Sequence, residues 1–146
     1  MNKFFEVKVK FKKTSEQGGQ KVVTEAFLLD ALSYSEAESR IHEEIKQYIS
    51  EEFKVANIRA TNYSEVHPSD NADKWFKSKI SLLAYDETSG KEKKTNIYLL
   101  VQADDVKDAH SRTVEVMKGS MGDYTIPSVS ETVIIDFFPY FSGEVE

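Results

Sequence analysis

The chain has 146 residues, no cysteine and a net charge of −6, and 40% of its residues are hydrophobic. This length and apolar content suffice to bury a core without disulfides, and the lack of cysteine excludes thiol nucleophiles and zinc sites built on thiolates. The negative charge argues against a general nucleic-acid coat protein, whose affinity comes from neutralising phosphates.

No apolar run reaches the ~20 residues that a membrane span requires, and charged residues interrupt the N-terminal segment before it attains the length of a signal peptide. We therefore expect a soluble cytoplasmic protein without a membrane partner. The absence of cysteine agrees with a reducing compartment.

The first predicted elements form a hairpin. Residues 4–13 alternate apolar and charged side chains, which is typical of a half-buried strand, and residues 21–30 form a second strand. The loop between them contains Gly18 and Gly19, which suits a turn with positive φ.

A helix is predicted from about residue 34 to residue 49. Ser33 and Glu36 have the spacing of a capping box at its start. Residues 53–60 form a third strand, and residues 61–66 either continue that strand or curl off its end.

The second half repeats this order of elements. Asp105 replaces Ser33 as the helix cap, and the helix ends before Gly119. The predicted strands of this half are 75–85, 95–103 and 124–129, followed by a strand-like run at 131–138.

Matching positions in the two halves lie 71 or 72 residues apart, as Phe5 and Phe76 do. The sequence therefore predicts two β-β-α-β repeats, at 1–66 and 74–146, joined by a polar linker at 67–73. We expect an α+β fold with a mainly antiparallel sheet. The favoured arrangement is one joined sheet of about six strands with both helices on one face, and the alternative is two small sheets packed together.

A Ser-Arg pair occurs at equivalent places in both predicted helices, as Ser39-Arg40 and Ser111-Arg112. Both arginines lie at the edge of the buried helical stripe. One interpretation is a twofold anion-binding site, because a guanidinium presents a bidentate fork to phosphate or carboxylate. The other is a boundary arginine whose stem covers the core while its head pairs with a neighbouring acid.

Two groups of lysines are candidates for a nucleic-acid-binding surface. Those of the first group alternate with apolar residues and so share one strand face, whereas those of the second cluster in a turn. The alternative is an ordinary solvated strand face and a soluble hairpin tip. The first group is Lys8, Lys10 and Lys12, and the second is Lys91, Lys93 and Lys94.

The sequence contains no recognisable catalytic motif. It has no Gly-x-Ser-x-Gly elbow and no glycine-rich phosphate loop. His42, His67 and His110 lack metal-ligand spacing, and His110 is expected on the apolar side of its helix. We therefore expect no enzyme, no metal and no cofactor.

Residues 134–141 are strongly apolar for a chain end. Such a segment needs to be covered, either by the core of its own subunit or by another subunit. These two possibilities are left open here.

Four segments together resemble a bacterial family catalogued as a domain of unknown function, which occurs mainly in Bacteroides, its relatives, and their phages and mobile elements. The segments are TEAFLLDALS (24–33), DKWFK (73–77), SGKEKKTN (89–96) and MKGSMGDY (117–124). The resemblance implies an origin and supplies no catalytic residues.

The leading hypothesis is a non-catalytic, homo-oligomeric binding protein that takes a host protein or a small anionic ligand at a pseudo-symmetric groove, through Arg40, Arg112, Ser39 and Ser111. One alternative is a phage protein that sequesters a nucleotide signal of host defence. Another is a nucleic-acid accessory protein that uses the basic strand face.

Overall fold

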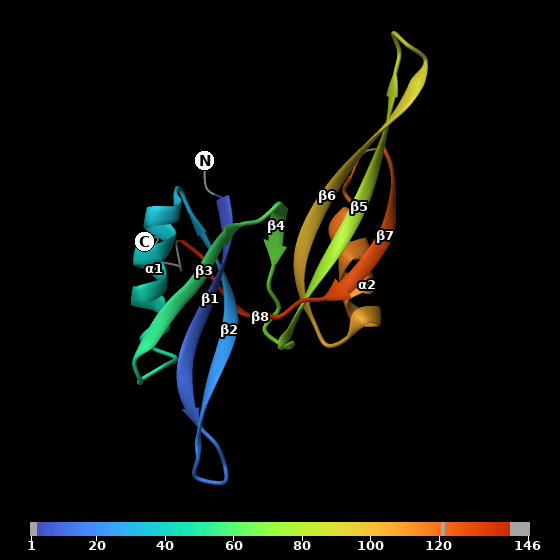
Figure 1. Ribbon diagram of the computed structural model, residues 1–146. Coiled ribbons are helices and arrows are strands. Elements are labelled where there is room, and N and C mark those ends of the chain that lie inside the picture. Colours follow the sequence, from blue (N-terminus) through green and yellow to red (C-terminus); the bar gives the residue numbers. More distant parts are fainter. Residues whose placement is uncertain (1–2, 121, 141–146) are drawn as a thin grey trace, which may run out of the picture. The chain divides into compact units, whose positions relative to one another are not determined.

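The computed structural model describes residues 3–120 and 122–140 (Figure 1). Within these ranges the chain forms eight strands and two helices, in the order that the duplicated sequence predicts. The elements are β1 (Lys3–Thr14), β2 (Gln20–Ala31), α1 (Tyr34–Ile45), β3 (Phe53–Ala60), β4 (Tyr63–His67), β5 (Lys74–Asp86), β6 (Lys91–Ala103), α2 (Val106–Met117), β7 (Asp123–Glu131) and β8 (Ile134–Phe138).

The chain folds into two compact units that do not coincide with the two halves of the sequence. The first unit combines Met1–Thr61 with Val133–Glu146, and the second is Asn62–Thr132. The C-terminal strand β8 thus belongs to the first unit, whereas β4 belongs to the second.

Each unit contains one four-stranded sheet, ordered β3-β1-β2-β8 in the first and β7-β5-β6-β4 in the second. The orders correspond strand by strand, except that the outermost strand beside β2 or β6 comes from the other repeat. This outer strand is parallel to its neighbour, and all other pairings are antiparallel. The two repeats therefore exchange their last strands.

The connection between β3 and β4 explains why the exchange is necessary. Thr61 is still tied to the sheet, because its backbone N–H and its hydroxyl both donate to the carbonyl of Phe4, at 2.9 and 2.8 Å. From Thr61 to Tyr63 the chain can span about 7 Å at most. The position beside β2 lies three strand spacings from β3, which is about 14 Å. A repeat therefore cannot fill this position with its own last strand.

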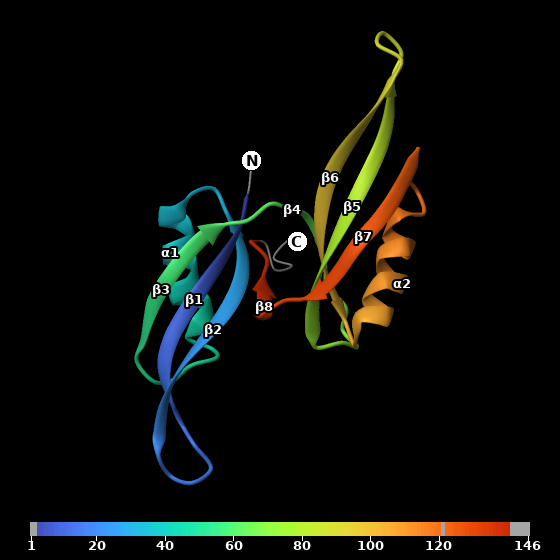
Figure 2. The ribbon, with the colours of Figure 1, turned by 45° about the vertical axis from the view of Figure 1, so that its right-hand side comes forward.

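A core in each unit lies between the helix and one face of its sheet (Figure 2). In the first unit, alternate residues of β1 meet the stripe of α1 that contains Ala37, Ile41 and Ile45. The opposite face of β1 carries the lysines, as the period of two requires.

The helix caps follow the predicted pattern. The Ser33 hydroxyl accepts from the Glu36 backbone N–H at 3.1 Å, and the Glu36 carboxylate accepts from the Leu32 backbone N–H at 2.6 Å. In α2, Asp105 and Asp108 accept in the same way, at 2.8 and 2.9 Å. Both helices thus begin where the sequence predicts.

The fold class is confirmed as α+β with mostly antiparallel sheets, but the favoured single joined sheet is wrong. Two separate sheets form, because each needs one strand from the other repeat and closes with it. Helix α1 ends at Ile45 rather than near Ile49. The predicted linker 67–73 includes the last residue of β4 and lies inside the second unit.

Replacement of Phe138 by Ala should lower the free energy of unfolding by about 3 kcal/mol, because this side chain is buried in the first core and its loss leaves a cavity. Ile135, three residues earlier in the same strand and 47% exposed, is the control. Its change to Ala should cost less than about 0.5 kcal/mol. Urea unfolding followed by circular dichroism measures both, and equal effects would contradict the assignment of β8 to this core.

Candidate functional site

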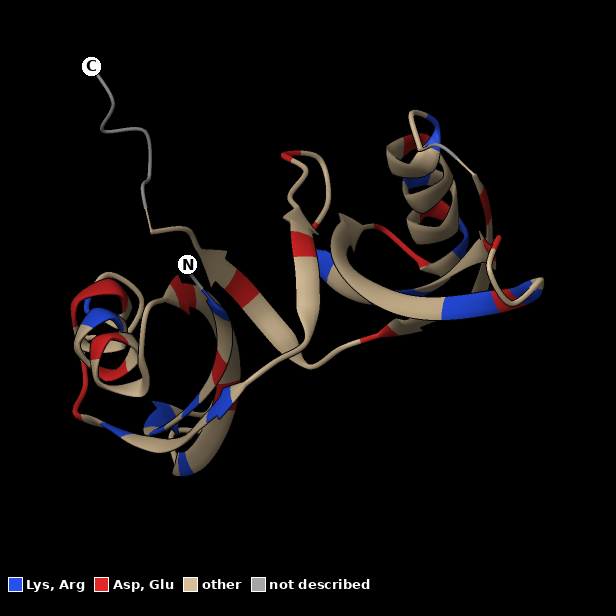
Figure 3. Ribbon diagram, turned by 90° about the horizontal axis from the view of Figure 1, so that it is seen from above, with Lys and Arg blue, Asp and Glu red and all other residues tan. Residues whose placement is uncertain are grey.

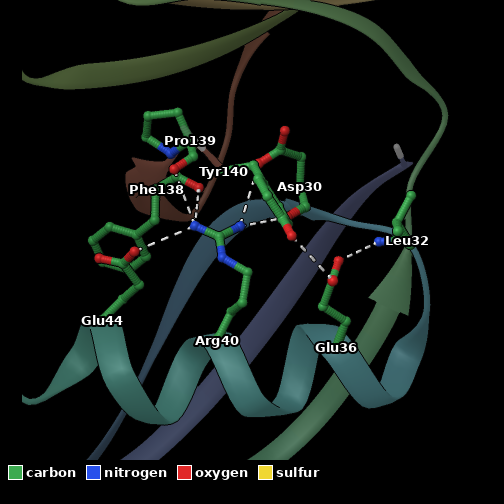
Figure 4. Close-up of polar contacts among 8 residues, drawn as sticks. All are labelled: Asp30, Leu32, Glu36, Arg40, Glu44, Phe138, Pro139 and Tyr140. Carbon is green, nitrogen blue, oxygen red and sulfur yellow. Dashed lines mark hydrogen bonds and ion pairs between the residues drawn. The ribbon is translucent and has the colours of Figure 1, made fainter. Parts of the chain in front are cut away.

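Arg40 binds the end of the exchanged strand β8 (Figure 4). Its Nη2 donates to the backbone carbonyls of Phe138 and Pro139, at 3.3 and 3.0 Å. The guanidinium also lies 5.1 Å from the centre of the Tyr140 ring. The side chain is only 14% exposed. Arg40 thus clamps the C-terminal segment onto the first unit.

Two carboxylates hold the guanidinium in this orientation. Nη1 donates to the Asp30 carboxylate at 3.3 Å and to the backbone carbonyl of the same residue, and Nη2 donates to Glu44 at 3.2 Å. Arg40 therefore matches the second interpretation of the sequence, a boundary arginine paired with neighbouring acids. Its donors are directed at groups of its own chain.

Arg112 makes the equivalent contact in the second unit. Its Nε donates to Asp108 at 3.0 Å, and its Nη1 donates to the Ser69 hydroxyl at 2.7 Å. Ser69 follows β4, and it matches Tyr140 in the repeat because the two residues lie 71 positions apart. Both arginines therefore fasten the segment that follows an exchanged strand.

The serines beside the arginines lie elsewhere. Ser39 and Ser111 are exposed on their helices, whereas the arginines are partly buried. The structure thus separates each serine from the contacts of its neighbouring arginine.

Further aromatic and polar contacts hold β8 against the first unit. The Phe138 ring stacks on Phe27 at 5.5 Å between centroids and lies 5.4 Å from Tyr48. The Tyr48 hydroxyl donates to the Asp136 carboxylate. This hydrogen bond, with partial burial and the charges of Asp136 and Glu44, raises the pKa of Tyr48 to about 12.

The lysines of the first unit form the second candidate site. Lys8, Lys10 and Lys12 lie on the face of the first sheet that does not contact α1, and Lys54 on β3 joins them because it pairs with Lys10. We call these four residues the lysine face. Figure 3 marks where lysine and arginine residues occur along the strands. Within residues 3–120 and 122–140, none of the four forms an ion pair.

The Lys10–Lys54 pair is unfavourable for the fold, because like charges directly opposite on neighbouring strands repel by roughly 0.2–1 kcal/mol. The equivalent register pair in the second sheet is Ser81 and Thr125, each 71 residues further on. The same architecture therefore folds with neutral residues at these positions. The Lys10–Lys54 pair is therefore specific to the first unit and not a requirement of the fold, whereas Lys8 has a repeat equivalent in Lys79.

An open hollow of about 420 Å³ lies at one end of the lysine face. Lys10, Lys12 and Lys54 line it together with the exposed side chain of Val22. Glu51 and Glu52 also line it, so acidic groups bound the positive surface on one side. The hollow combines cations with an apolar patch.

The second predicted lysine group has a different environment. Lys91 lies opposite Asp86 across the β5–β6 hairpin, whereas Lys93 and Lys94 face the uncharged residues Ala84 and Leu83. Oppositely charged or neutral partners surround these lysines, as in a soluble hairpin tip. They are not brought together with the lysine face by any pairing within a sheet.

The histidines do not converge. His42 contacts the Phe53 ring at 5.2 Å, His67 bonds Glu65 at 2.8 Å, and His110 is exposed rather than half-buried as expected. In the part of the chain that the structure describes, no group of three or more His, Asp or Glu side chains is placed to hold a metal ion.

Sequence reasoning found the arginines and three of the lysines but missed Lys54 and the exchanged strands. The alternation of Phe53, Lys54 and Val55 was a usable signal for the fourth lysine, because it places Lys54 on the face opposite the core. Of the predicted apolar tail, residues 134–138 form β8, and Phe141 lies outside the described residues.

Among the described residues, neither helix is long and apolar enough to cross a membrane.

The chain belongs to the family described as "Domain of unknown function (DUF4494)", whose model matches residues 3–140. This confirms the predicted membership of a family of unknown function. No curated protein and no solved structure matches the chain.

Replacement of Arg40 by Ala should release β8, because the two carbonyls that end the strand lose their donor. We expect stability to fall by about 2 kcal/mol and the amides of β8 to exchange hydrogen at least tenfold faster. Hydrogen-exchange mass spectrometry measures the second effect. Ser39→Ala, on an exposed neighbour, should leave both quantities unchanged. Unaltered exchange in Arg40→Ala would show that the clamp is dispensable.

High pH should also loosen β8. The pKa of Tyr48 is raised in the folded state, so its contribution to stability is complete below pH 10 and is lost as the pH rises towards 12. Thermal unfolding of the wild type and of Tyr48→Phe should differ at pH 9 and converge near pH 12. A constant difference across this range would contradict the proposed hydrogen bond.

Proposed function

We propose that the chain is a non-catalytic binding protein and that the lysine face binds a phosphate-bearing ligand. The observation that carries this proposal is the Lys10–Lys54 pair, which the fold does not need and which costs stability. Unpaired cations of this kind are stabilised when an anion binds between them.

The spacing of the lysines suits an extended polyanion. Alternate residues of a strand repeat about every 6.8 Å, so Lys8, Lys10 and Lys12 form a row of charges along β1. A nucleic-acid backbone presents such charges in series, and its binding releases condensed counterions. The net charge of −6 confines this attraction to a local surface.

The hollow favours a small phosphate-bearing ligand, such as a single nucleotide, over a polymer. Its volume of about 420 Å³ falls within the range of small-ligand sites. A nucleotide could place its phosphate between Lys10 and Lys54 and its base against Val22. This version accommodates the hypothesis of a phage protein that sequesters a nucleotide signal.

In this proposal the two arginines have a structural role and do not bind the ligand, in contrast to the leading hypothesis from the sequence. Arg40 and Arg112 already donate to carbonyl, carboxylate and hydroxyl groups of their own chain. A small anion or a host protein that binds through them would have to displace an exchanged strand. The lysine face requires no such rearrangement.

The resemblance noted in the sequence supports a source in Bacteroides-type genomes, their phages or mobile elements, and we propose that the protein acts in the cytoplasm of that bacterial host. The absence of cysteine agrees with a reducing compartment. Native mass spectrometry of protein purified from its own host identifies any co-purified ligand.

The double variant Lys10→Ser/Lys54→Thr tests the proposal, because it installs the residues that the second unit uses at the same register positions. Binding of a single-stranded oligonucleotide, followed by fluorescence anisotropy, should weaken. The slope of log K against log salt should fall in magnitude by about 1.4, since each phosphate contact contributes about 0.7.

The matched control is Lys93→Ser/Lys94→Thr, which changes the net charge equally but alters the other hairpin. It should leave affinity and slope unchanged. Equal losses in both variants, or no binding by the wild type at low salt, would contradict an oligonucleotide site.

Nucleoside monophosphates and cyclic nucleotides form the second arm. A ligand present at 100 times its dissociation constant should stabilise the wild type by about 2.7 kcal/mol, and the Lys10→Ser/Lys54→Thr variant should show no shift. If only mononucleotides stabilise the protein, the ligand site is the hollow. If only the oligonucleotide binds, the ligand site is the row of lysines along β1. Failure of both arms would overturn the proposed function.

A further inference from the structure

The outer edge of β2 is a built site for one extended strand. The backbone of β8 pairs with Ala26–Leu29 in parallel, Phe138 stacks on Phe27, and Arg40 binds the carbonyls that follow. We call this site the strand slot. The slot therefore binds three features of a strand: its backbone, one aromatic side chain and the carbonyl groups at its C-terminal end.

The strand slot can be filled only from another repeat. The first repeat cannot reach it, because the chain from Thr61 to Tyr63 spans about 7 Å and the slot lies about 14 Å from β3. The register adds a second obstacle. Strand β3 ends level with Leu29, whereas the occupant of the slot begins level with Ala26, so β4 would have to run back along the sheet first.

The contacts in the slot do not depend on which chain supplies the strand. The contacts of β8 with Arg40, Tyr48 and Phe27 join it to α1, to the residues after α1 and to β2. The Phe137 ring also lies 6.0 Å from the ring of Phe4 on β1. The connection to β7 passes through Thr132 and Val133 alone. Thr132 is held by its own unit, since it donates to the Trp75 carbonyl at 2.9 Å through both its backbone and its hydroxyl.

We propose that the strand slot also binds β8 of a second copy of this chain, giving dimers in which the C-terminal strands are exchanged between molecules. The contacts within the slot are the same in both cases, so the choice depends on concentration. A tethered strand competes at an effective concentration in the millimolar range for a short linker, and intermolecular exchange grows as the protein approaches that range or as its own strand is weakened.

The slot of the second unit is a poorer candidate for exchange. At the position equivalent to Phe138, strand β4 carries His67, which bonds Glu65 rather than stacking on a ring. Arg112 contacts a serine hydroxyl where Arg40 contacts two carbonyls. The first unit therefore has the more specific seat, and β8 is the strand that we expect to exchange.

Two complementary variants test the proposal. Phe138→Ala has an intact slot and a defective strand, whereas Arg40→Ala has an intact strand and a defective slot. Only in a mixture can an intact slot meet an intact strand, and only between chains. The mixed dimer has one fully intact pair, and its other slot, which lacks both contacts, can stay open at no further cost. Native mass spectrometry of an isotopically labelled chain mixed with an unlabelled one should therefore show the mixed dimer in roughly tenfold excess over the dimer of either variant alone, which corresponds to about 1.4 kcal/mol.

The control mixture pairs Phe138→Ala with the double variant Arg40→Ala/Phe138→Ala, in which no intact strand exists. It should show no excess of mixed dimer. Circular dichroism verifies folding, and Phe138→Leu with Arg40→Lys replaces the alanine pair if either of those variants unfolds. Equal amounts of dimer in the complementary and control mixtures would overturn the proposal. Because the lysine face takes no part, this outcome is independent of ligand binding.

Discussion

The structure depends on a distance that its own chain cannot span. The third strand of each repeat lies at one edge of its sheet and is followed by an anchored threonine, Thr61 or Thr132. The next strand begins after a single intervening residue. The vacancy that this strand would fill lies at the opposite edge, three strand spacings away. Exchange between the repeats resolves the conflict. The discontinuous first unit and the parallel outer strands follow from it.

An exchanged strand needs a fastening that a hairpin strand does not. Strands β1 and β2 are held in register by a tight turn, but β8 arrives from the other repeat and pairs along one side only. Arg40 supplies the missing constraint, because a partly buried guanidinium with several fixed donors can bind two successive carbonyls and define where the strand stops. Arg112 does so more loosely through Ser69. The arginine recurs in both repeats because each unit has to hold the end of a strand that comes from the other repeat.

Much of this fold was predictable from local patterns. The periods of two and 3.6, the caps at Ser33 and Asp105 and the offset of 71 residues identified the elements and their duplication. The partner of each outer strand was not predictable, because β4 and β8 are short and their pairing is set by the length of a connector. The arginines were found for the right reason, their place at the edge of the core. The groups that they hold after the exchanged strands are two backbone carbonyls for Arg40 and a serine hydroxyl for Arg112, and these carry no sequence signal.

Where the two repeats diverge is more informative about binding than where they agree. Agreement is explained by the fold: the caps, the threonine anchors and the arginine clamps recur because each unit needs them. The Lys10–Lys54 pair does not recur, since Ser81 and Thr125 occupy the same register positions without loss of the sheet. Its repulsion is a cost to the first unit alone. A cost that the architecture does not impose supports the proposal that the lysine face binds an anion, since its four lysines form no ion pair within the described part of the chain.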